Sequence, residues 1–257
     1  MQNLTIIKVG GKIVEEPDTL AALITDFAAI PGLKLLVHGG GRSATRLASQ
    51  LGIEQQMVDG RRITDADTLR IVTMVYGGLV NKNIVCSLQA KGINAIGLTG
   101  ADMDIIRSHR RPAGAIDYGF VGDVDRVDAK AIARLLDAGL VPVIAPLSHD
   151  GNGSMLNTNA DTIASEVAQA LAPLFNTTLT FCFEKAGVLA DQDDDNSVIK
   201  KINRATYQQL RDQNIIAGGM IPKLDNAFKA LDSGVKEVVI TRADAIANAD
   251  CGTSICL

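Results

Sequence analysis

The stretch LTIIKVGG at residues 4–11 joins an apolar, β-branched run to a lysine and two consecutive glycines. The run predicts a buried strand, and the glycines predict a turn in which backbone N–H groups are exposed. The same order returns at residues 34–42, where KLLVHGGGR leads into a helical stretch. Strands that end in such loops are typical of a parallel sheet whose loops gather along one edge.

Short apolar runs alternate with amphipathic stretches along the rest of the chain. Strands are predicted at residues 4–9, 34–38, 95–98, 141–145, 179–183 and 237–241. Helices are predicted at residues 19–29, 42–51, 65–91, 129–138, 161–170, 205–213 and 223–233. The alternation predicts an α/β fold with an open, mainly parallel sheet sandwiched between helices.

Two segments interrupt this pattern. Residues 107–124 contain prolines, glycines and a basic cluster, and predict a hairpin that is either a lid or a surface insertion. The basic cluster comprises Arg107, His109, Arg110 and Arg111. The acidic run at residues 191–196 has the aspartate spacing of a calcium loop but lacks its glycine and final glutamate, so we expect a solvated turn.

Composition narrows the class of protein. A net charge of −4 and a pI near 5.4 argue against a nucleic-acid partner. We see no signal peptide and no apolar run near the roughly 20 residues that span a membrane, so we expect a cytoplasmic protein. The cysteines lack CxxC spacing and predict buried thiols in a reducing compartment. They are Cys86, Cys182, Cys251 and Cys256.

The first glycine loop follows Lys8. Gly10 and Gly11 let an anion approach the backbone, and the lysine adds a positive charge, which suits a phosphate. A plain turn with an outward lysine is the alternative. The second loop, at residues 38–41, leads into a helix near Ser43 whose N-terminus favours a carboxylate or a phosphate. His38 itself reads as a packing residue at the strand end.

A different function competes at the second loop. Gly39, Gly41 and Ala44 match the G-x-G-x-x-A pattern of nicotinamide-binding oxidoreductases, with Asp59 at the distance of a ribose-binding acid. That fingerprint needs a strand before the acid, and the two residues at 57–58 are short for one. The oxidoreductase therefore remains an alternative hypothesis.

The segment GRRIT at residues 60–64 carries two adjacent arginines. A guanidinium grips a carboxylate through two parallel hydrogen bonds. Adjacent side chains point in different directions, so we expect either Arg61 or Arg62 to face a pocket. Thr64 and Asp67 resemble a capping box for the following helix.

Two later segments add polar groups. In NTNAD at residues 157–161, Asn157 and Asn159 would share one face if extended, and Asp161 either caps the next helix or orients lysines. In GGMIPK at residues 218–223, Lys223 lies at a helix start, where the helix dipole disfavours a cation unless an anion binds there. Together with Lys8, this predicts phosphoryl transfer without a Walker loop.

At these residues the sequence resembles the acetylglutamate kinases of the amino-acid kinase family. The likeness runs almost from end to end and rests on ordered motifs. They are KVGG at 8–11, HGGG at 38–41, GRRIT at 60–64, LTG at 98–100, GFVGDV at 119–124, NTNAD at 157–161, GGMIPK at 218–223 and GTSI at 252–255.

The resemblance implies one amino-acid kinase domain over residues 1–257. Its N-lobe, to about residue 150, would bind an acylglutamate, and its C-lobe, about 151–257, would bind ATP, with Mg²⁺ held mainly by the phosphates and no protein ligand. Lys8, Lys223 and Asp161 would be catalytic. The acylglutamate would contact Gly40, Gly41, Arg62, Asn157 and Asn159. Phosphate or nucleotide would contact Gly10, Gly11, Glu184, Gly187, Gly219 and Met220.

The expected reaction is the phosphorylation of an N-acylglutamate, with acetyl as the default and succinyl as the other choice. One departure lies at Phe183, Glu184 and Lys185, where the family usually has a small polar residue, Asp and Val. The chain opens at its first strand, which predicts a homodimer with little arginine sensitivity. A non-catalytic sensor of the arginine pathway is the remaining alternative, and both lysines argue against it.

Overall fold

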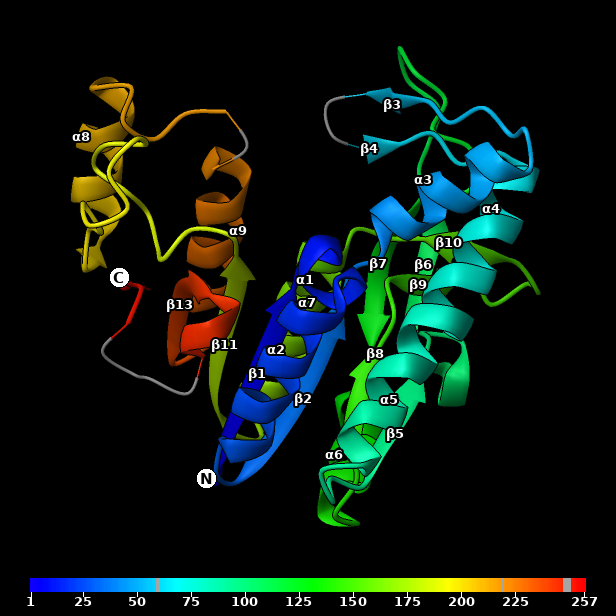
Figure 1. Ribbon diagram of the computed structural model, residues 1–257, viewed down its shortest axis with the longest axis horizontal. Coiled ribbons are helices and arrows are strands. Elements are labelled where there is room, and N and C mark those ends of the chain that lie inside the picture. The colour runs from blue at the N-terminus through cyan, green and yellow to red at the C-terminus, as the bar shows by residue number, and fades with distance from the viewer. Residues whose placement is uncertain (59–60, 219, 247–250) are drawn as a thin grey trace.

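The computed structural model describes residues 1–58, 61–218, 220–246 and 251–257. Its centre is an eight-stranded sheet (Figure 1). From one edge to the other the strands are β12 (Lys201–Ile202), β14 (Thr253–Ile255), β13 (Glu237–Arg242), β11 (Asn176–Phe183), β1 (Asn3–Val9), β2 (Leu33–His38), β8 (Val141–Ile144) and β5 (Ala95–Leu98). The six strands that the sequence predicted form one continuous parallel set from β13 to β5.

Strand β1 lies near the middle of this sheet, between β2 and β11. Its side chains alternate between the two faces, so Ile6 and Ile7 are both fully buried, but in different hydrophobic clusters. Burial on both faces explains why the strands read as continuous apolar runs rather than as alternating ones.

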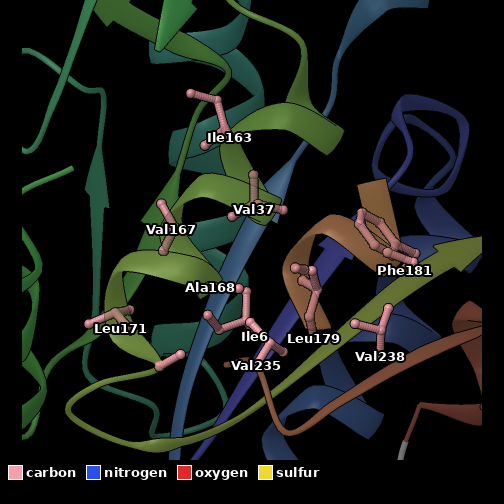
Figure 2. Close-up of a cluster of buried hydrophobic side chains, with 14 of the residues drawn as sticks. Ile6, Val37, Ile163, Val167, Ala168, Leu171, Leu179, Phe181, Val235 and Val238 are labelled. Atoms are coloured by element: carbon pink, nitrogen blue, oxygen red, sulfur yellow. The ribbon is translucent and has the colours of Figure 1, made fainter. Parts of the chain in front are cut away.

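Helices cover both faces of the sheet, as the α/β pattern predicted (Figure 1). The face that buries Ile7 packs against α1 (Gly11–Glu15), α2 (Pro17–Ala29), α3 (Gly41–Gln50), α4 (Ala66–Val72), the π-helix η1 (Thr73–Val80) and α5 (Asn81–Gln89). The face that buries Ile6 packs against α6 (Ala129–Asp137), α7 (Ala160–Leu171), α8 (Arg204–Asp212) and α9 (Met220–Asp232). Figure 2 shows Ile6 and Leu179 in one cluster with Val167 and Ala168 of α7.

The helix Ala66–Gln89 is formed by α4, η1 and α5. It has 24 residues, and its most apolar 18-residue window has a mean hydropathy of 1.3, so it is long and apolar enough to cross a membrane by length and composition. The sequence shows no uninterrupted apolar run here, because charged residues such as Asp67, Arg70 and Lys82 interrupt the helix. A polar residue inside this helix, Asn81, is buried and donates a 2.9 Å hydrogen bond to Val143 O of β8, so this part of the helix packs against the central sheet.

A second, four-stranded sheet has the order β10-β9-β6-β7. Its strands are β6 (Ile106–Arg110), β7 (Gly122–Val127), β9 (Leu147–His149) and β10 (Met155–Asn157). The antiparallel pairing of β6 with β7 confirms the hairpin predicted within residues 107–124. A small hairpin of β3 (Met57–Val58) and β4 (Arg61–Arg62) completes the strands, and the 3₁₀ turns are η2 (Asp102–Asp104) and η3 (Ala243–Ala245).

Some local predictions were wrong. The cap of α4 is Asp65, which accepts a 2.7 Å hydrogen bond from Thr68 N, instead of Thr64 with Asp67. Of the two roles left open for Asp161, the cap of α7 belongs instead to Asn159, because the helix begins at Ala160, and Asp161 pairs with Lys8. The four cysteines are free, but of these only Cys182 is buried and Cys86 is exposed.

Candidate active site

The predicted site residues gather at the carboxyl end of the central strands. Lys8 lies near the end of β1, and the glycine loops follow β1 and β2. On the neighbouring side, α7 and α9 bring Asp161 and Lys223 from distant parts of the sequence (Figure 1). This edge is where parallel α/β sheets bind ligands, because the loops and helix N-termini converge there.

The two glycine loops touch each other. A Cβ atom on Gly11 would lie 3.1 Å from the backbone nitrogens of both Gly40 and Gly41, and one on Gly39 would lie 2.9 Å from Gly11 N. Side chains would therefore separate the loops or fill the space between them. The first N–H groups of α3 have no partner inside the helix, and one of them, Ser43 N, donates to Glu15 Oε1 at 2.9 Å. The helix end therefore already accepts a carboxylate, and the neighbouring glycine N–H groups suit an anion in the same way.

The buried side chain of His38 contacts the backbone of the second loop. Its ring is completely buried, with Nδ1 2.7 Å from Gly39 O and Nε2 3.1 Å from the side-chain amide of Asn81. With Nδ1–H donating to the carbonyl and Nε2 accepting from the amide, the ring is neutral. Burial lowers its pKa to about 4, the Gly39 hydrogen bond raises it and the charge of Lys82 lowers it. His38 is thus the packing residue that the sequence predicted, with hydrogen bonds added.

A cavity of about 220 Å³ opens beside the second loop. Its lining includes Gly40, Gly41, Arg62, Asn157 and Asn159, which are the residues expected to hold the acylglutamate. Segments from three separate regions of the sequence therefore converge on one hollow.

Arg62 gives this cavity its charge. Only 8% of it is exposed, and its guanidinium donates to Gln55 Oε1, to Gly41 O at 2.9 Å and to Thr45 Oγ1 at 2.9 Å. All three acceptors are neutral, and no carboxylate among the described residues lies within ion-pair distance of it. A buried cation without a counter-ion favours an anionic ligand. Arg61 is exposed at the rim of the same cavity.

The asparagines are held in different ways. Asn157 donates from Nδ2 to Thr64 Oγ1 at 3.0 Å, which ties β10 to the segment after β4. Asn159 accepts at Oδ1 from the backbone nitrogens of Asp161 and Thr162 at 2.8 and 3.1 Å. Because the cap uses the oxygen, the NH₂ group of Asn159 is the part of its amide that remains for a ligand.

Lys8 and Asp161 form an ion pair with an Nζ–Oδ1 distance of 2.7 Å. Both side chains are largely shielded from water, with exposures of 7% and 19%. Lys223 is close enough to feel both charges: burial lowers its pKa, Asp161 raises it and Lys8 lowers it further. Its Nζ lies 3.6 Å from the centre of the Phe183 ring, and Lys8 Nζ lies 5.2 Å from the same ring.

A second, larger hollow of about 750 Å³ lies on the other side of the loops. Gly10, Gly11 and Glu184 line it, together with Lys12 and Phe183. Glu184 pairs with Lys12 at 2.9 Å, and this hydrogen bond lowers the pKa of the carboxyl. Three of the residues expected to contact the nucleotide therefore share one surface.

The other predicted nucleotide contacts lie elsewhere. Gly187 is buried, lines neither hollow, and has no room for a side chain because a Cβ would lie 2.7 Å from Thr253 Oγ1. Met220 begins α9 and packs on the core. Gly219, like Asp59 and Gly60, lies outside the described residues.

Sequence reasoning missed two aromatic residues of the site. Tyr76 of η1 lines the cavity, and a Cβ on Gly40 would lie 2.8 Å from its ring. Tyr76 lies among apolar residues and glycines of η1, and no local motif distinguishes it. Phe183 was visible only as a departure from the family pattern. That departure was the one signal that could have drawn attention to it.

The nicotinamide-binding alternative is not supported. After the glycine loop and α3 the chain enters β3, which pairs only with β4 in a two-stranded hairpin. The dinucleotide fingerprint needs the next strand of the parallel sheet at that point, because that strand carries the ribose-binding acid.

Fold and site define a class of protein. The chain belongs to the amino acid kinase family, which it matches over residues 3–242. It is 67% identical over 254 residues to the acetylglutamate kinase of Phocaeicola vulgatus, covering 99% of this chain and 98% of that one. The acetylglutamate kinase of Bacteroides thetaiotaomicron is 66% identical over 245 residues, with 95% of each chain covered. A solved protein of Streptococcus mutans UA159, smu.665, is 29% identical and superposes with a TM-score of 0.80 over 98% of each chain.

Proposed function

We propose that this chain phosphorylates N-acetyl-L-glutamate on its side-chain carboxylate, using ATP, in arginine biosynthesis. One observation carries the chemistry: the Lys8–Asp161 ion pair and Lys223 lie together at the sheet edge, beside a cavity with an uncompensated arginine. The relatives named above act as acetylglutamate kinases at about two-thirds identity over nearly the whole chain. This combination favours an enzyme over a non-catalytic sensor.

The residues divide the chemistry between them. Arg62, Asn157 and Asn159 bind the acylglutamate and direct its side-chain carboxylate toward the glycine loops. A carboxylate oxygen attacks the γ-phosphorus, the bond to the β–γ bridging oxygen breaks, and ADP leaves with the released negative charge. Lys8 and Lys223 stabilise the negative charge of the transferring group, as positioned cations do in phosphoryl transfer.

Asp161 has an organising role in this proposal. Its carboxylate fixes Lys8 at 2.7 Å and lowers the repulsion between two ammonium groups that must act together. The backbone N–H groups of Gly10, Gly11, Gly40 and Gly41 add dipoles that need no rearrangement during the reaction.

Magnesium enters as part of the MgATP substrate. No group of three or more His, Cys, Asp or Glu side chains that could hold a metal occurs within the described parts of the chain. The carboxylate nearest the lysines, Asp161, is already paired. We propose that Mg²⁺ is held mainly by the nucleotide phosphates, with no protein ligand.

N-succinyl-L-glutamate is a second candidate substrate, and one observation favours it. Arg111 lines the cavity, where it could meet a second carboxylate. Its guanidinium, however, pairs with Asp123 through contacts of 2.5 and 3.0 Å, and that pair lowers the pKa of Asp123. The other basic residues of the hairpin pair with aspartates as well: Arg107 with Asp104, His109 with Asp125 and Arg110 with Asp117. We therefore retain acetyl as the preferred group.

The assembly completes the proposal. We assign acylglutamate binding mainly to an N-lobe reaching about residue 150, with Asn157 and Asn159 contributed by the C-lobe, and ATP binding to that C-lobe over about 151–257. We further propose a cytoplasmic homodimer that contacts neither nucleic acid nor a membrane. Support for the dimer comes from the open edge at β5 and from exposed apolar side chains on η1, Met74 and Leu79.

One assay tests the function. ADP release is followed with N-acetyl-L-glutamate, N-succinyl-L-glutamate, glutamate and aspartate, and hydroxylamine traps the acyl phosphate as a hydroxamate. We expect turnover with the acetylated substrate, slower turnover with the succinylated one, and none with the free amino acids. Absence of turnover with every acylated substrate would contradict the proposal. Lys223→Ala is expected to lower kcat by about 100-fold or more, because its charge acts on the transition state.

A further inference from the structure

Phe183 occupies an unusual place for an apolar side chain. It lies at the end of β11, partly buried, with the ammonium groups of Lys8 and Lys223 near its ring. The strand register explains why Lys8 lies near the Phe183 ring. Lys8 of β1 pairs with Phe181 of β11, and Phe181 and Phe183 share a face of the strand because they are two residues apart. The side chains of Lys8, Phe181 and Phe183 therefore all project toward α7 and α9.

The Phe183 ring packs beside the ring of Phe181. Phe181 is completely buried, and its ring is nearly parallel to that of Phe183, with a 9° angle between planes and 6.3 Å between centres. The strand and the buried neighbour therefore fix the face that Phe183 presents. The ammonium of Lys223 at 3.6 Å from the centre is well inside the distance at which a cation is attracted to a ring face.

The charges around Phe183 indicate what its ring contributes. Two lysines share the single carboxylate of Asp161, whose ion pair is with Lys8. Lys223 has no ion-paired carboxylate among the described residues. Burial most strongly disfavours its ammonium form by lowering its pKa, the charge of Asp161 raises that pKa and the charge of Lys8 lowers it. The negative face of an aromatic ring attracts a cation without carrying a net charge. Phe183 thus supplies the attraction that a second carboxylate would otherwise supply.

A ring suits this place better than a carboxylate. A second acid beside Lys223 would repel the transferring phosphoryl group and compete with it for the ammonium. A cation–ring contact is weaker than the attraction between an ammonium and a phosphate, so it orders a long, flexible side chain yet yields to a phosphate. A lysine that is already oriented needs less rearrangement when the reaction occurs.

We propose that Phe183 is a positioning residue, whose ring face holds the Lys223 ammonium ready for the transferring phosphoryl group. The inference deepens the proposed kinase function and depends on it for its kinetic consequence.

Fluorination tests the ring without changing its shape. Phenylalanine with one, two or three ring fluorines is incorporated at position 183, which makes the ring face progressively less negative while the packing is nearly kept. We expect kcat to fall stepwise along the series and to fall by about 2- to 30-fold in Phe183→Leu, the range that 0.5–2 kcal/mol covers. KM for N-acetyl-L-glutamate should stay unchanged, and Phe183→Tyr should retain most of the rate.

The matched control is the same fluorinated series at Phe175, a buried residue of the same core that makes no such lysine contact. It should leave kcat unchanged. A kcat that stays flat along the series at 183, or falls equally at 175, would overturn the proposal, because the ring would then only pack.

A second measurement separates this inference from the proposed function. The rate at which Lys223 is acylated by acetic anhydride is followed against pH by peptide mass spectrometry, which needs no turnover. A ring face stabilises the ammonium, so fluorination at 183 should shift the Lys223 profile to lower pH. An unchanged profile would overturn the inference even in an active enzyme. If the wild type showed no kinase activity but fluorination at 183 still shifted the Lys223 profile, only the proposed function would be overturned.

Discussion

At the scale of single residues, the Lys8–Asp161 pair links stability to catalysis. Asp161→Asn leaves a buried ammonium without its partner, so we expect the free energy of unfolding to fall by about 3 kcal/mol and kcat to fall at least tenfold. Urea unfolding and the ADP assay measure the two effects. In Lys8→Met/Asp161→Asn the uncompensated charge is gone, so stability should largely return while activity stays lost. A double variant as unstable as Asp161→Asn would contradict this account.

His38 predicts a pH-dependent stability. Its pKa is about 4 in the folded protein, against 6.5 for an ordinary histidine. Between these values the unfolded chain binds a proton that the folded chain excludes, so the free energy of unfolding falls as the pH falls from about 7 to 4. The contribution at stake is about 3 kcal/mol.

The matching variant for this prediction is His38→Gln, which has no titrating ring. We expect urea unfolding at pH 7, 6 and 5 to show a smaller loss of stability for His38→Gln than for the wild type over this window. Parallel pH curves for the two proteins would show that His38 does not supply the dependence.

The sequence could identify the charged residues of the site, because each stands in a glycine- or asparagine-rich motif that ordinary packing does not require. It could not identify Phe183 as a lysine contact. That contact depends on the register of β1 with β11, and strands more than 160 residues apart leave no local signal of their pairing. Tyr76 was missed for a similar reason, since it meets Gly40 only after the long helix packs on α3.

At the scale of elements, variants at the N-caps of α7 and α6 distinguish a loss of stability from a loss of substrate binding. Asn159 caps α7 beside the cavity, whereas Asp128 caps α6 by accepting a 2.9 Å hydrogen bond from Ala131 N. Asn159→Ala and Asp128→Ala should each lower the free energy of unfolding by about 1 kcal/mol. Only Asn159→Ala should raise KM for N-acetyl-L-glutamate, by about tenfold. An equal effect of both variants on KM would mean that the asparagine acts only as a cap.

The major elements were predictable because their physics is local. Apolar runs, helical periodicity and glycine punctuation marked the six parallel strands and the seven helical stretches that the sequence predicted. The short strands β9, β10 and β12 were not predicted, because two or three residues carry no periodicity of their own, and β14 was expected only from the family resemblance of residues 252–255. The caps were misplaced by one or two residues, since neighbouring Asp, Asn and Thr residues compete for the same role.

At the scale of the whole molecule, the proposed dimer makes a measurable prediction. Light scattering coupled to size exclusion should give twice the chain mass of 27.1 kDa. Met74→Glu with Leu79→Glu places two charges on the exposed face of η1, where the parent side chains are 53% and 56% exposed, and should shift the protein toward monomer. Leu174→Glu, at a residue 40% exposed in another region, is the control and should remain dimeric. A wild type of single-chain mass would contradict the dimer.

The place of β1 also has a consequence for biosynthesis. Asn3 pairs with Asn176, so the strand that carries Lys8 leaves the ribosome long before the strand that completes its pairing. At roughly 5–20 residues per second, the unmatched edge of β1 waits for roughly 10–35 s. During that time the nascent N-terminal part presents an apolar strand edge open to other chains. A ribosome that stalls before β11 therefore leaves a fragment that cannot assemble the lysines, however well its first half has folded.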